Sequence, residues 1–359
     1  RLRVLARAHT PAAAENLRSF DADHIIDPFE TFADHLVLAM RAPGAYRLLH
    51  WLSAPPGARL AKEHEPPRGS WVICGYGRFG RAIRDALAGN GVITRIIDPI
   101  PPEGAPAATP APIAPAPAVP SWTAGAGAAR STRPPHPHDA LEGGFVVGVG
   151  TERDVLERAR IAEADGLVAG TDDDIANLAI VAMARRLNPK LFTVIRQNET
   201  VNEPLFERIR ADLVLRPSEI IAEEALALLS TPLLGHFLDE VRRQTDGWAD
   251  EVIHQLRDRM GTRAPKIWTV TLDPREAPAL ALAWRGGVRP LVLGELMRDP
   301  GRRELPLEAR ALMLLRDGQR TMLPGDEMLL QPGDRILFAG RGDARRRLAL
   351  TLADGNALE

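Results

Sequence analysis

Gly75, Gly77 and Gly80 are spaced as G-x-G-x-x-G, and this pattern constrains the fold more than any other feature of the chain. The apolar residues before it predict a strand at 71–74, and the amphipathic residues after it predict a helix at 77–88. In that context the first glycine allows a tight turn and the second lets the backbone approach a pyrophosphate. The third lets the helix pack closely on the strand. The N–H groups that open the helix would then face the phosphates.

A carboxylate follows at the place that a nucleotide-binding fold requires. Asp98 comes directly after the next predicted strand, 92–97, which is the second strand of the predicted unit. It can accept hydrogen bonds from a ribose diol, and its charge disfavours a ribose that carries a 2′-phosphate. We therefore predict a nucleotide site made of the three glycines, Asp98 and the loop residues Tyr76 and Phe79. The alternative is a glycine turn with a purely structural role.

Strands and helices alternate through the region that follows, which predicts a parallel sheet with helices on both faces. The predicted strands fall at 145–150, 166–170, 191–196 and 212–217, and the predicted helices near 151–160, 173–187 and 201–210. The predicted fold class is α/β. A Rossmann-like parallel sheet forms the N-lobe, and helices cross over to a small α+β C-lobe.

The pattern changes after residue 228. Apolar residues at helical spacing predict two crossover helices within 229–264, separated by a break at the residues TDGW. From 265 to 353, short apolar runs alternate with turn residues and predict the strands of the C-lobe. These runs are KIWTVTL, RPLVLGEL, ALMLLRDG and MLLQPGDRILFAG.

Two soft segments interrupt the pattern. Residues 100–141 are dominated by Pro and Ala, show no helical or strand period and contain few large apolar side chains. Such a segment cannot bury enough surface to offset the entropy lost on ordering, so we predict a flexible, partly polyproline insert. Residues 53–69 are rich in Pro and polar residues and predict an interdomain linker.

An internal repeat relates the start of the chain to its middle. Residues 6–40 align without gaps onto 195–229. The matched residues fall at turns and strand edges, and include Arg7 with Arg196, Asp23 with Asp212, and Pro28 with Pro217. We predict that residues 1–52 are the second half of a first copy of the lobe, whose phosphate loop lies upstream, and that 70–228 are the second copy. Chance similarity between two helix–strand units is the alternative.

The composition argues against several classes of function. The chain has 359 residues and a formal net charge of -2, which gives no electrostatic reason for a nucleic-acid partner. No run reaches the ~18 apolar residues that span a bilayer, and the first residues lack the apolar core of a signal peptide. The single cysteine, Cys74, excludes an internal disulfide. These features predict a cytoplasmic protein.

Few residues are available for catalysis. Hydride transfer needs an acid or base beside the nicotinamide, but the residues after 265 contain no His, Tyr or Cys. His236 and His254 lie on predicted helices, where we expect surface or packing roles. The chain shows neither a metal-ligand spacing nor a P-loop. We therefore predict that it is not an enzyme. An NAD-dependent oxidoreductase remains an alternative, as does a scaffold whose glycine loop binds nothing.

Several stretches resemble the RCK (KTN/TrkA) regulatory domains of potassium channels and transporters. The run CGYGRFGRAI resembles the glycine loop of that family, in which an arginine follows the second glycine. Residues 150–189 resemble the segment from its third to its fourth strand, 209–225 the strand and helix that close the nucleotide lobe, and 330–340 the end of its C-terminal lobe. The resemblance covers nearly the whole chain apart from the Pro/Ala insert, and implies tandem copies.

The resemblance also implies roles for individual residues. Arg78 would reach a ligand phosphate, and Asp98 would hold the adenosine ribose. Thr171 and Asp172 would lie at the edge of the pocket after the fourth strand, and Arg196 would be a polar residue at the end of the fifth. The implied ligand is an adenine nucleotide or NAD(H) in a regulatory role. A solvated Arg78 and an internal ion pair of Arg196 are the alternatives.

The chain departs from the family pattern in three places. Gly148-Val149 stands where the family often has Gly-Asp, which removes a carboxylate from the adenine side. The sequence Pro217-Ser218-Glu219 stands where the family often has Pro-Glu, so the sequence leaves open whether a cation site exists there. The Pro/Ala insert follows directly after Asp98, at the predicted mouth of the pocket.

The function that this resemblance implies is nucleotide-sensitive control of potassium movement. The implied location is the cytoplasm, at the inner face of the cell membrane. The implied partner is a potassium pore, either upstream on the same chain or on a partner subunit. The chain itself would form a homo-oligomer, a dimer within a ring of RCK domains. Ligand binding would stabilise one lobe arrangement over another.

Overall fold

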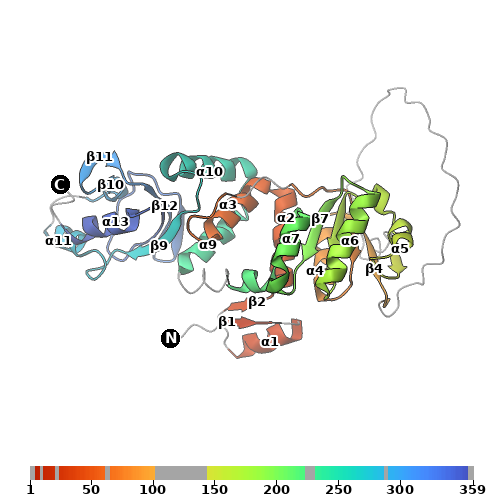
Figure 1. The fold of residues 1–359 in the computed structure, drawn as a ribbon. Coiled ribbons are helices and arrows are strands. Elements are labelled where there is room, and N and C mark those ends of the chain that lie inside the picture. Colours follow the sequence, from red (N-terminus) through yellow and green to blue (C-terminus); the bar gives the residue numbers. More distant parts are fainter. Residues whose placement is uncertain are drawn as a thin grey trace, which may run out of the picture. The chain divides into compact units, whose positions relative to one another are not determined.

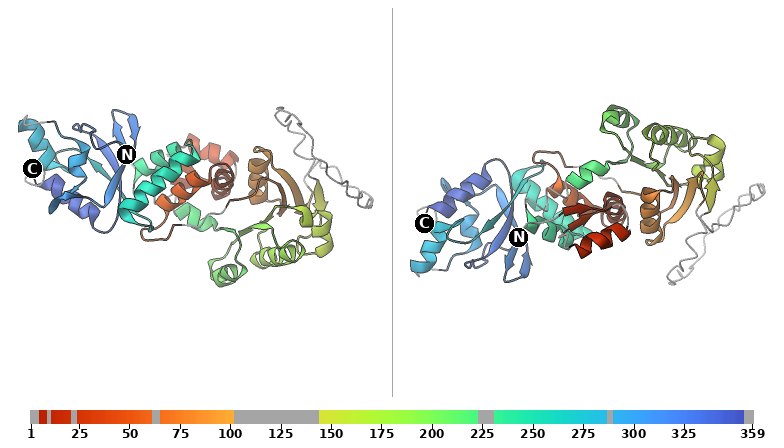
Figure 2. Two further views of the ribbon diagram at one scale, coloured as in Figure 1. Left: turned by 90° about the horizontal axis from the view of Figure 1, so that it is seen from above. Right: turned by 90° about the horizontal axis from the view of Figure 1, so that it is seen from below.

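The computed structural model describes residues 5–8, 11–20, 24–60, 65–101, 144–222, 231–286 and 290–354 (Figure 1; Figure 2 gives two further views). Most of the predicted insert at 100–141 therefore lies outside the described residues. The chain divides into two compact units, one made of residues 28–37 and 66–217 and the other of 1–27, 38–65 and 218–359. In the described part of the chain, no helix combines the length and hydropathy needed to cross a membrane.

A six-stranded sheet lies at the centre of the unit that contains the glycine motif (Figure 1). Its strands are β3 (Ser70–Cys74), β4 (Ile93–Asp98), β5 (Phe145–Val147), β6 (Gly166–Ala169), β7 (Phe192–Arg196) and β8 (Leu213–Leu215). They are ordered β5-β4-β3-β6-β7-β8, and every pairing is parallel. This is the strand order of a Rossmann-like fold, so the predicted α/β class and parallel sheet are confirmed.

Helices connect these strands and cover the sheet. They are α4 (Arg78–Ala88), α5 (Arg153–Arg158), α6 (Asp174–Leu187) and α7 (Glu203–Ile209), with short 3-10 turns η2 (Ile161–Glu163) and η3 (Thr200–Asn202). Val72 and Cys74 of β3 belong to one apolar cluster with residues of α5, α6 and α7. Because strand side chains alternate, Trp71 and Ile73 face the other side, and both are fully buried. A sheet buried on both faces explains why its strands read as continuous apolar runs.

The elements of this unit lie close to their predicted bounds. The largest difference is at β5, predicted for 145–150 but observed only as Phe145–Val147. Gly148 has a φ of 155°, a conformation that other residues rarely adopt, and it ends the strand. The predicted strand at 212–217 is also shorter, because Pro217 opens a helical segment at 217–222 instead of continuing β8.

The first residues form a parallel strand pair with a helix between the strands. The elements are β1 (Leu5–Arg7), α1 (Pro11–Ser19) and β2 (His24–Ile26), followed by α2 (Pro28–Arg41). Ala6 lies opposite Ile25, and the alignment found in the sequence converts this pair into Ile195 opposite Val214, which β7 and β8 also show. The two segments thus share both their element order and their strand register.

Three helices pack around an apolar cluster in the other unit. They are α3 (Pro43–Ser53), α9 (Pro232–Val241) and α10 (Asp246–Met260), and the cluster includes Leu48, Leu52, Leu233, Phe237, Val252 and Leu256. Two helices, α9 and α10, thus lie within 229–264, where the sequence predicted two. The residues TDGW, however, start the second helix, because the Thr245 hydroxyl accepts the N–H of Trp248 and caps α10.

A four-stranded antiparallel sheet ordered β13-β12-β14-β9 forms the C-terminal part of the same unit. Its elements are β9 (Lys266–Thr271), α11 (Pro278–Gly286), α12 (Leu293–Leu296), β10 (Arg298–Asp299), β11 (Arg302–Pro306), β12 (Ala309–Arg316), β13 (Gln319–Met322), β14 (Arg335–Gly340) and α13 (Ala344–Ala353). Within the described part of RPLVLGEL, Val292 forms an isolated antiparallel bridge with Leu329, but the predicted strand does not continue, because the end of the run forms helix α12. Leu293 and Leu296 are both buried, at the spacing of one helical turn.

Candidate functional site

The candidate site lies where the strand order of the parallel sheet reverses. Strands β3 and β6 are neighbours there, and each leads through a short loop into a helix, α4 and α6 respectively. In sheets of this type, ligands bind outside the carboxyl ends of the strands at such a point. The loop after β3 carries the glycine motif, and the loop after β6 carries Thr171 and Asp172.

Packing within the chain requires two of the three glycines. Gly75 has a φ of 96°, and a Cβ atom there would lie 3.1 Å from the backbone of Gly170. A Cβ atom at Gly80 would lie 1.9 Å from the carbonyl oxygen of Gly75. Only glycine therefore lets the chain turn at 75 and lets α4 begin this close to the turn.

Gly77 is needed for neither of these reasons. Its φ of -67° is open to any residue, and a Cβ atom there would meet no described atom within 4 Å. Gly77 is the N-cap of α4 and provides no side chain to cap it. The N–H groups in the first turn of a helix have no acceptors within the helix. The loop therefore combines open space with backbone donors, which is the arrangement that accepts a phosphate group.

Asp98 braces this loop. One carboxylate oxygen accepts the N–H of Tyr76 at 2.6 Å, and the other accepts the N–H of Ile100 at 2.9 Å. The sequence predicts that Asp98 accepts hydrogen bonds from a ribose. The structure shows a role within the chain, because the carboxylate fixes the backbone between Gly75 and Gly77. Each carboxylate oxygen retains a lone pair for a further donor.

The ring of Tyr76 lies among cations. The guanidinium carbons of Arg81 and Arg84 lie 5.7 and 5.8 Å from its centroid, and Arg81 also donates to the Tyr76 carbonyl oxygen at 3.1 Å. Phe145 of β5 contacts the ring edge-on, with 6.1 Å between centroids. These contacts fix the side chain that stands between the first two glycines.

Asn177, which the sequence did not single out, holds the loop after β6. Its side-chain oxygen accepts the N–H of Thr171 at 2.9 Å and the Thr171 hydroxyl at 2.7 Å. Its amide nitrogen donates to the carbonyl oxygens of Thr171 and Arg196, at 3.0 and 2.9 Å. Asn177 is fully buried, so it links the ends of β6 and β7. An asparagine within an otherwise apolar helix face was the sequence signal that could have revealed it.

Two acidic residues open helix α6. Asp173 is the N-cap and accepts the N–H groups of Ile175 and Ala176. Asp174 is buried and accepts four hydrogen bonds at 2.6 to 3.0 Å from residues 198, 199 and 202 in the loop after β7. Burial by itself raises the pKa of Asp174, but the hydrogen bonds from Asn202, Asn198 and the Glu199 N–H outweigh it, so the pKa lies below its ordinary value.

Two arginines converge on the ring of Phe29. The guanidinium carbon of Arg78 lies 5.1 Å from the ring centroid and that of Arg196 lies 4.9 Å from it. Arg196 also forms an ion pair with Asp172 at 2.6 Å, as one of the alternatives from the sequence proposed. The Nε atom of Arg196 is nevertheless buried without a hydrogen-bond partner among the described residues.

The structure brings all the predicted site residues together at this edge of the sheet. The contacts above join the glycine loop to Asp98, to Thr171 and Asp172, and to Arg196. Phe79 is only 1% exposed, and its ring packs against Phe29 and Phe32, so only its backbone can contribute to a ligand site. The part of each residue in ligand binding remains a prediction.

The described part of the chain contains neither a metal-ligand cluster nor a reactive thiol. No group of three or more His, Cys, Asp or Glu residues there could hold a metal ion. Burial raises the pKa of the Cys74 thiol to about 12, so the thiol stays protonated at neutral pH.

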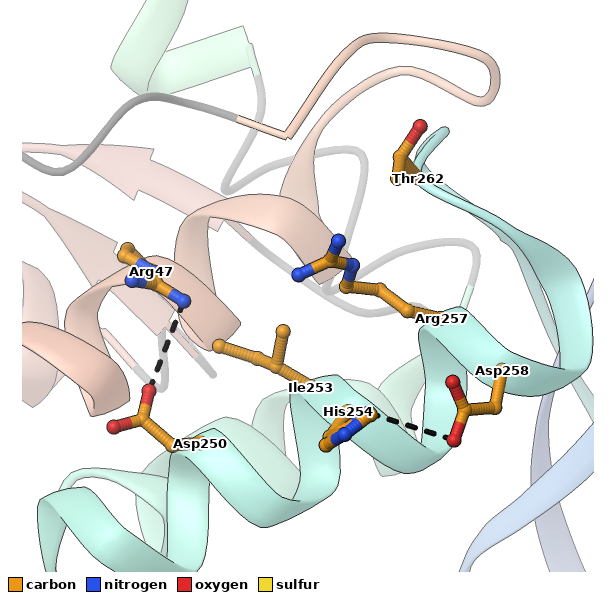
Figure 3. Close-up of a pocket in the computed structure, with 7 residues that line it drawn as sticks. All are labelled: Arg47, Asp250, Ile253, His254, Arg257, Asp258 and Thr262. Atoms are coloured by element: carbon orange, nitrogen blue, oxygen red, sulfur yellow. Dashed lines mark ion pairs between the residues drawn. The ribbon is translucent and has the colours of Figure 1, made fainter.

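A separate cavity of about 400 Å³ lies in the other unit, beside α3 and α10 (Figure 3). It is lined by Arg47, Asp250, Ile253, His254, Arg257, Asp258 and Thr262. Arg47 pairs with Asp250 at 3.7 Å, and His254 pairs with Asp258 at 3.4 Å. His254 is largely exposed, as expected for a helix-surface residue. None of the predicted site residues lines this cavity.

Part of this chain is similar in sequence to a known domain family and to known proteins. The TrkA-N domain family matches residues 138–217, which include β5 to β8 but not the glycine motif. A Trk system potassium uptake protein TrkA homolog of Pyrococcus abyssi is 33% identical over 97 residues, which are 26% of this chain and 43% of that protein. The matched part thus spans less than half the length of this relative.

Solved structures with a similar fold include the GsuK RCK domain, with a TM-score of 0.45 and 15% identity. That alignment covers 98% of this chain and 75% of the GsuK chain. A structure of the GsuK channel bound to NAD has a TM-score of 0.44 and 14% identity, over 98% of this chain and 62% of the other.

Proposed function

Because the chain carries a TrkA-N domain of the RCK family, we propose that it is a nucleotide-sensing regulatory region of a potassium channel or transporter. Ligand binding at the glycine loop would favour one arrangement of the lobes and so control ion flux. The relatives named above support the link to potassium transport, and the geometry of the loop supports the link to a nucleotide.

The observation that carries this proposal is the environment of Gly77. Gly75 and Gly80 are explained by the turn and by close packing, but no described contact explains why residue 77 is glycine. A ligand whose phosphates approach the backbone at that point supplies the reason. The N–H groups that open α4 would hold the phosphates, and Asp98 would hold the ribose. Arg78 and Arg196 would balance the phosphate charge.

An adenine nucleotide or NAD(H) is the ligand class that fits this arrangement. The carboxylate of Asp98 disfavours a 2′-phosphate on the ribose, so NADP(H) is the poorer candidate. The site offers no catalytic base among the residues that we place around the loop. We therefore propose that the ligand is read and not chemically changed.

The partner that we propose is a potassium pore, on the same chain or on another subunit. The chain would act as a homo-oligomer at the inner face of the cell membrane, in the cytoplasm. Moving a two-state gate from mostly closed to mostly open requires about 5 kcal/mol of differential ligand affinity, which several copies can share.

We also propose that the chain contains parts of two tandem lobes. Residues 1–52 would be the second half of a first lobe, 53–69 a linker and 70–228 the second lobe. Residues 229–264 would be the crossover helices, and 265–353 the C-lobe. The support is the sequence repeat, which carries the strand register of β1 with β2 onto that of β7 with β8. The N–H of Ala8 donates to the Ile26 carbonyl, as that of Gln197 does to Leu215.

Calorimetric titration of the wild type with ADP, AMP and NAD, compared with Gly77→Asp, tests the proposal. The aspartate would occupy the space of the phosphates and repel them, so binding should be lost. Gly247→Asp is a matched control, because residue 247 also lies in the first turn of a helix and its Cβ atom would also meet no described atom within 4 Å. Equal affinity in wild type and Gly77→Asp would refute the proposal.

Two further measurements address the alternatives. An oxidoreductase would change NADH absorbance in the presence of substrates, whereas we expect no turnover in wild type. Asp98→Ala should weaken nucleotide binding by about 1.5–3 kcal/mol, the scale of hydrogen bonds to a charged group. A scaffold whose glycine turn is only structural would bind no nucleotide in either protein.

A further inference from the structure

Helix α2 contributes an aromatic side chain to the nucleotide lobe from outside the continuous α/β region. Residues 28–37 belong to the same compact unit as 66–217, although the predicted linker 53–69 separates them in the sequence. Phe29, in the first turn of α2, is only 3% exposed. Its ring lies 5.8 Å from that of Phe79, the residue after Arg78 in the glycine loop.

The ring of Phe29 is shared by two cations that come from different strands. Arg78 follows β3 and the glycine turn, and Arg196 is the last residue of β7. Their guanidinium carbons lie 5.1 and 4.9 Å from the same ring centroid, so one side chain holds both cations. Both guanidinium groups are positively charged, so a phosphate group that reached both of them would gain a charge-assisted contact with each.

The surroundings of Arg196 also favour a phosphate as its partner. Its side chain is only 14% exposed, while its partner Asp172 is 91% exposed, so water weakens that ion pair. The buried Nε atom of Arg196 has no hydrogen-bond partner among the described residues. A buried donor without an acceptor is costly, and a phosphate oxygen is an acceptor of the kind that it lacks.

We infer that Phe29 is a positioning residue of the nucleotide site, whose ring holds Arg78 and Arg196 ready for the phosphate groups of the ligand. This inference rests on the proposed function, because it assigns the phosphate end of the same site. It has a mechanical consequence. A phosphate that binds both arginines would also restrain the ring that both of them contact, and with it the start of α2.

Phe32 is the matched control on the same helix. It is also buried, at 8% exposed, and its ring also lies 5.8 Å from that of Phe79. The arginine contacts that the structure records are those of Phe29. Replacing each phenylalanine by leucine removes similar packing, but only Phe29→Leu removes the contacts with the two guanidinium groups.

The experiment compares ADP with adenosine by calorimetry on the full chain. Each cation–π contact is worth a factor of about two to five in affinity, so Phe29→Leu should weaken ADP binding about tenfold. Adenosine binding should change less than twofold, because adenosine carries no phosphate. Phe32→Leu should leave the ratio of the two affinities as in wild type. Phe29→Tyr keeps the ring and should restore that ratio.

Hydrogen exchange on wild type gives a second readout that needs no variant. ADP should slow amide exchange in residues 28–37 more than saturating adenosine does. The inference is overturned if Phe29→Leu and Phe32→Leu change the ADP-to-adenosine ratio alike, if Phe29→Tyr fails to restore it, or if ADP and adenosine protect α2 equally. If wild type binds neither ligand, the proposed function falls with the inference. Binding of ADP without these differences removes the inference alone.

Discussion

Asp174→Asn should destabilise the nucleotide lobe although it changes only one atom of the side chain. One oxygen of Asp174 accepts the backbone and side-chain N–H groups of Asn198, and the other accepts the backbone N–H of Glu199 and the side-chain amide of Asn202. An amide can accept at only one of its two ends, so two donors lose their acceptor. Each buried donor left unpaired costs about 1–3 kcal/mol, so the two together predict a loss of about 2–6 kcal/mol in the free energy of unfolding.

The neighbouring residue provides the control. Asp173 accepts the N–H groups of Ile175 and Ala176 as the N-cap of α6. Asparagine caps helices about as well as aspartate, so Asp173→Asn should change stability by less than about 0.5 kcal/mol. Urea unfolding followed by circular dichroism, with hydrogen exchange to locate the change at residues 197–202, measures both variants. Equal stability of the two variants would refute the role assigned to Asp174.

The pH dependence of the unfolding free energy is a second test of the role of Asp174. The pKa of Asp174 is lowered in the folded protein, so the unfolded chain binds its proton more tightly. The stability that the carboxylate contributes is therefore fully present above the ordinary carboxyl pKa of about 4, and is lost as the pH falls through the lowered value. The difference between wild type and Asp174→Asn should be greatest near pH 7 and should shrink below about pH 4. A difference that grows on acidification would contradict this reasoning.

Three further predictions concern other contacts. Gly80→Ala should lower the free energy of unfolding by about 2–4 kcal/mol, because the new methyl group would lie 1.9 Å from the Gly75 carbonyl oxygen. Gly77→Ala should change the free energy of unfolding by less than about 0.5 kcal/mol. Asp334→Ala should lower the free energy of unfolding by about 3 kcal/mol, because the buried carboxylate accepts two hydrogen bonds from Arg316 at 2.7 and 2.8 Å. A change below about 1 kcal/mol in urea unfolding would contradict this prediction. Cys74, whose pKa burial raises to about 12, should resist iodoacetamide at pH 8 until the protein unfolds, and mass spectrometry of the native protein should show no adduct.

The sequence by itself determined the features that depend on local chain chemistry. Gly75 lies in a turn that needs a positive φ, and the glycine spacing predicted this turn. The apolar strand before it and the amphipathic residues after it predicted where the helix begins. The alternation of apolar runs and helical segments from 71 to 217 fixed the parallel α/β class. The repeat of 6–40 in 195–229 predicted an element order that the structure shows in both segments, and the structure adds that β1–β2 and β7–β8 also share their register.

Local sequence patterns did not predict the structure where the same residues could form either of two elements. The sequence run TDGW looked like a break, but the capping hydroxyl of Thr245 makes it a helix start. The run RPLVLGEL looked like a strand, but burial of Leu293 and Leu296 on one side of a turn makes its end a helix. Apolar content alone does not distinguish these outcomes, because packing against the rest of the unit decides them.

Only the tertiary structure decided which side chains complete the candidate site. Asn177 and Asp174 are polar residues in a helix, and their partners include residues at the end of β7 and in the loop after it, which the sheet brings beside them. Phe29 precedes the linker and the whole continuous α/β region, yet its ring contacts both Arg78 and Arg196. Contacts of this kind depend on how elements fold back on one another, so one-dimensional spacing cannot reveal them. The sequence located the turn and the helix start of the candidate site, and the tertiary structure determined which side chains surround them.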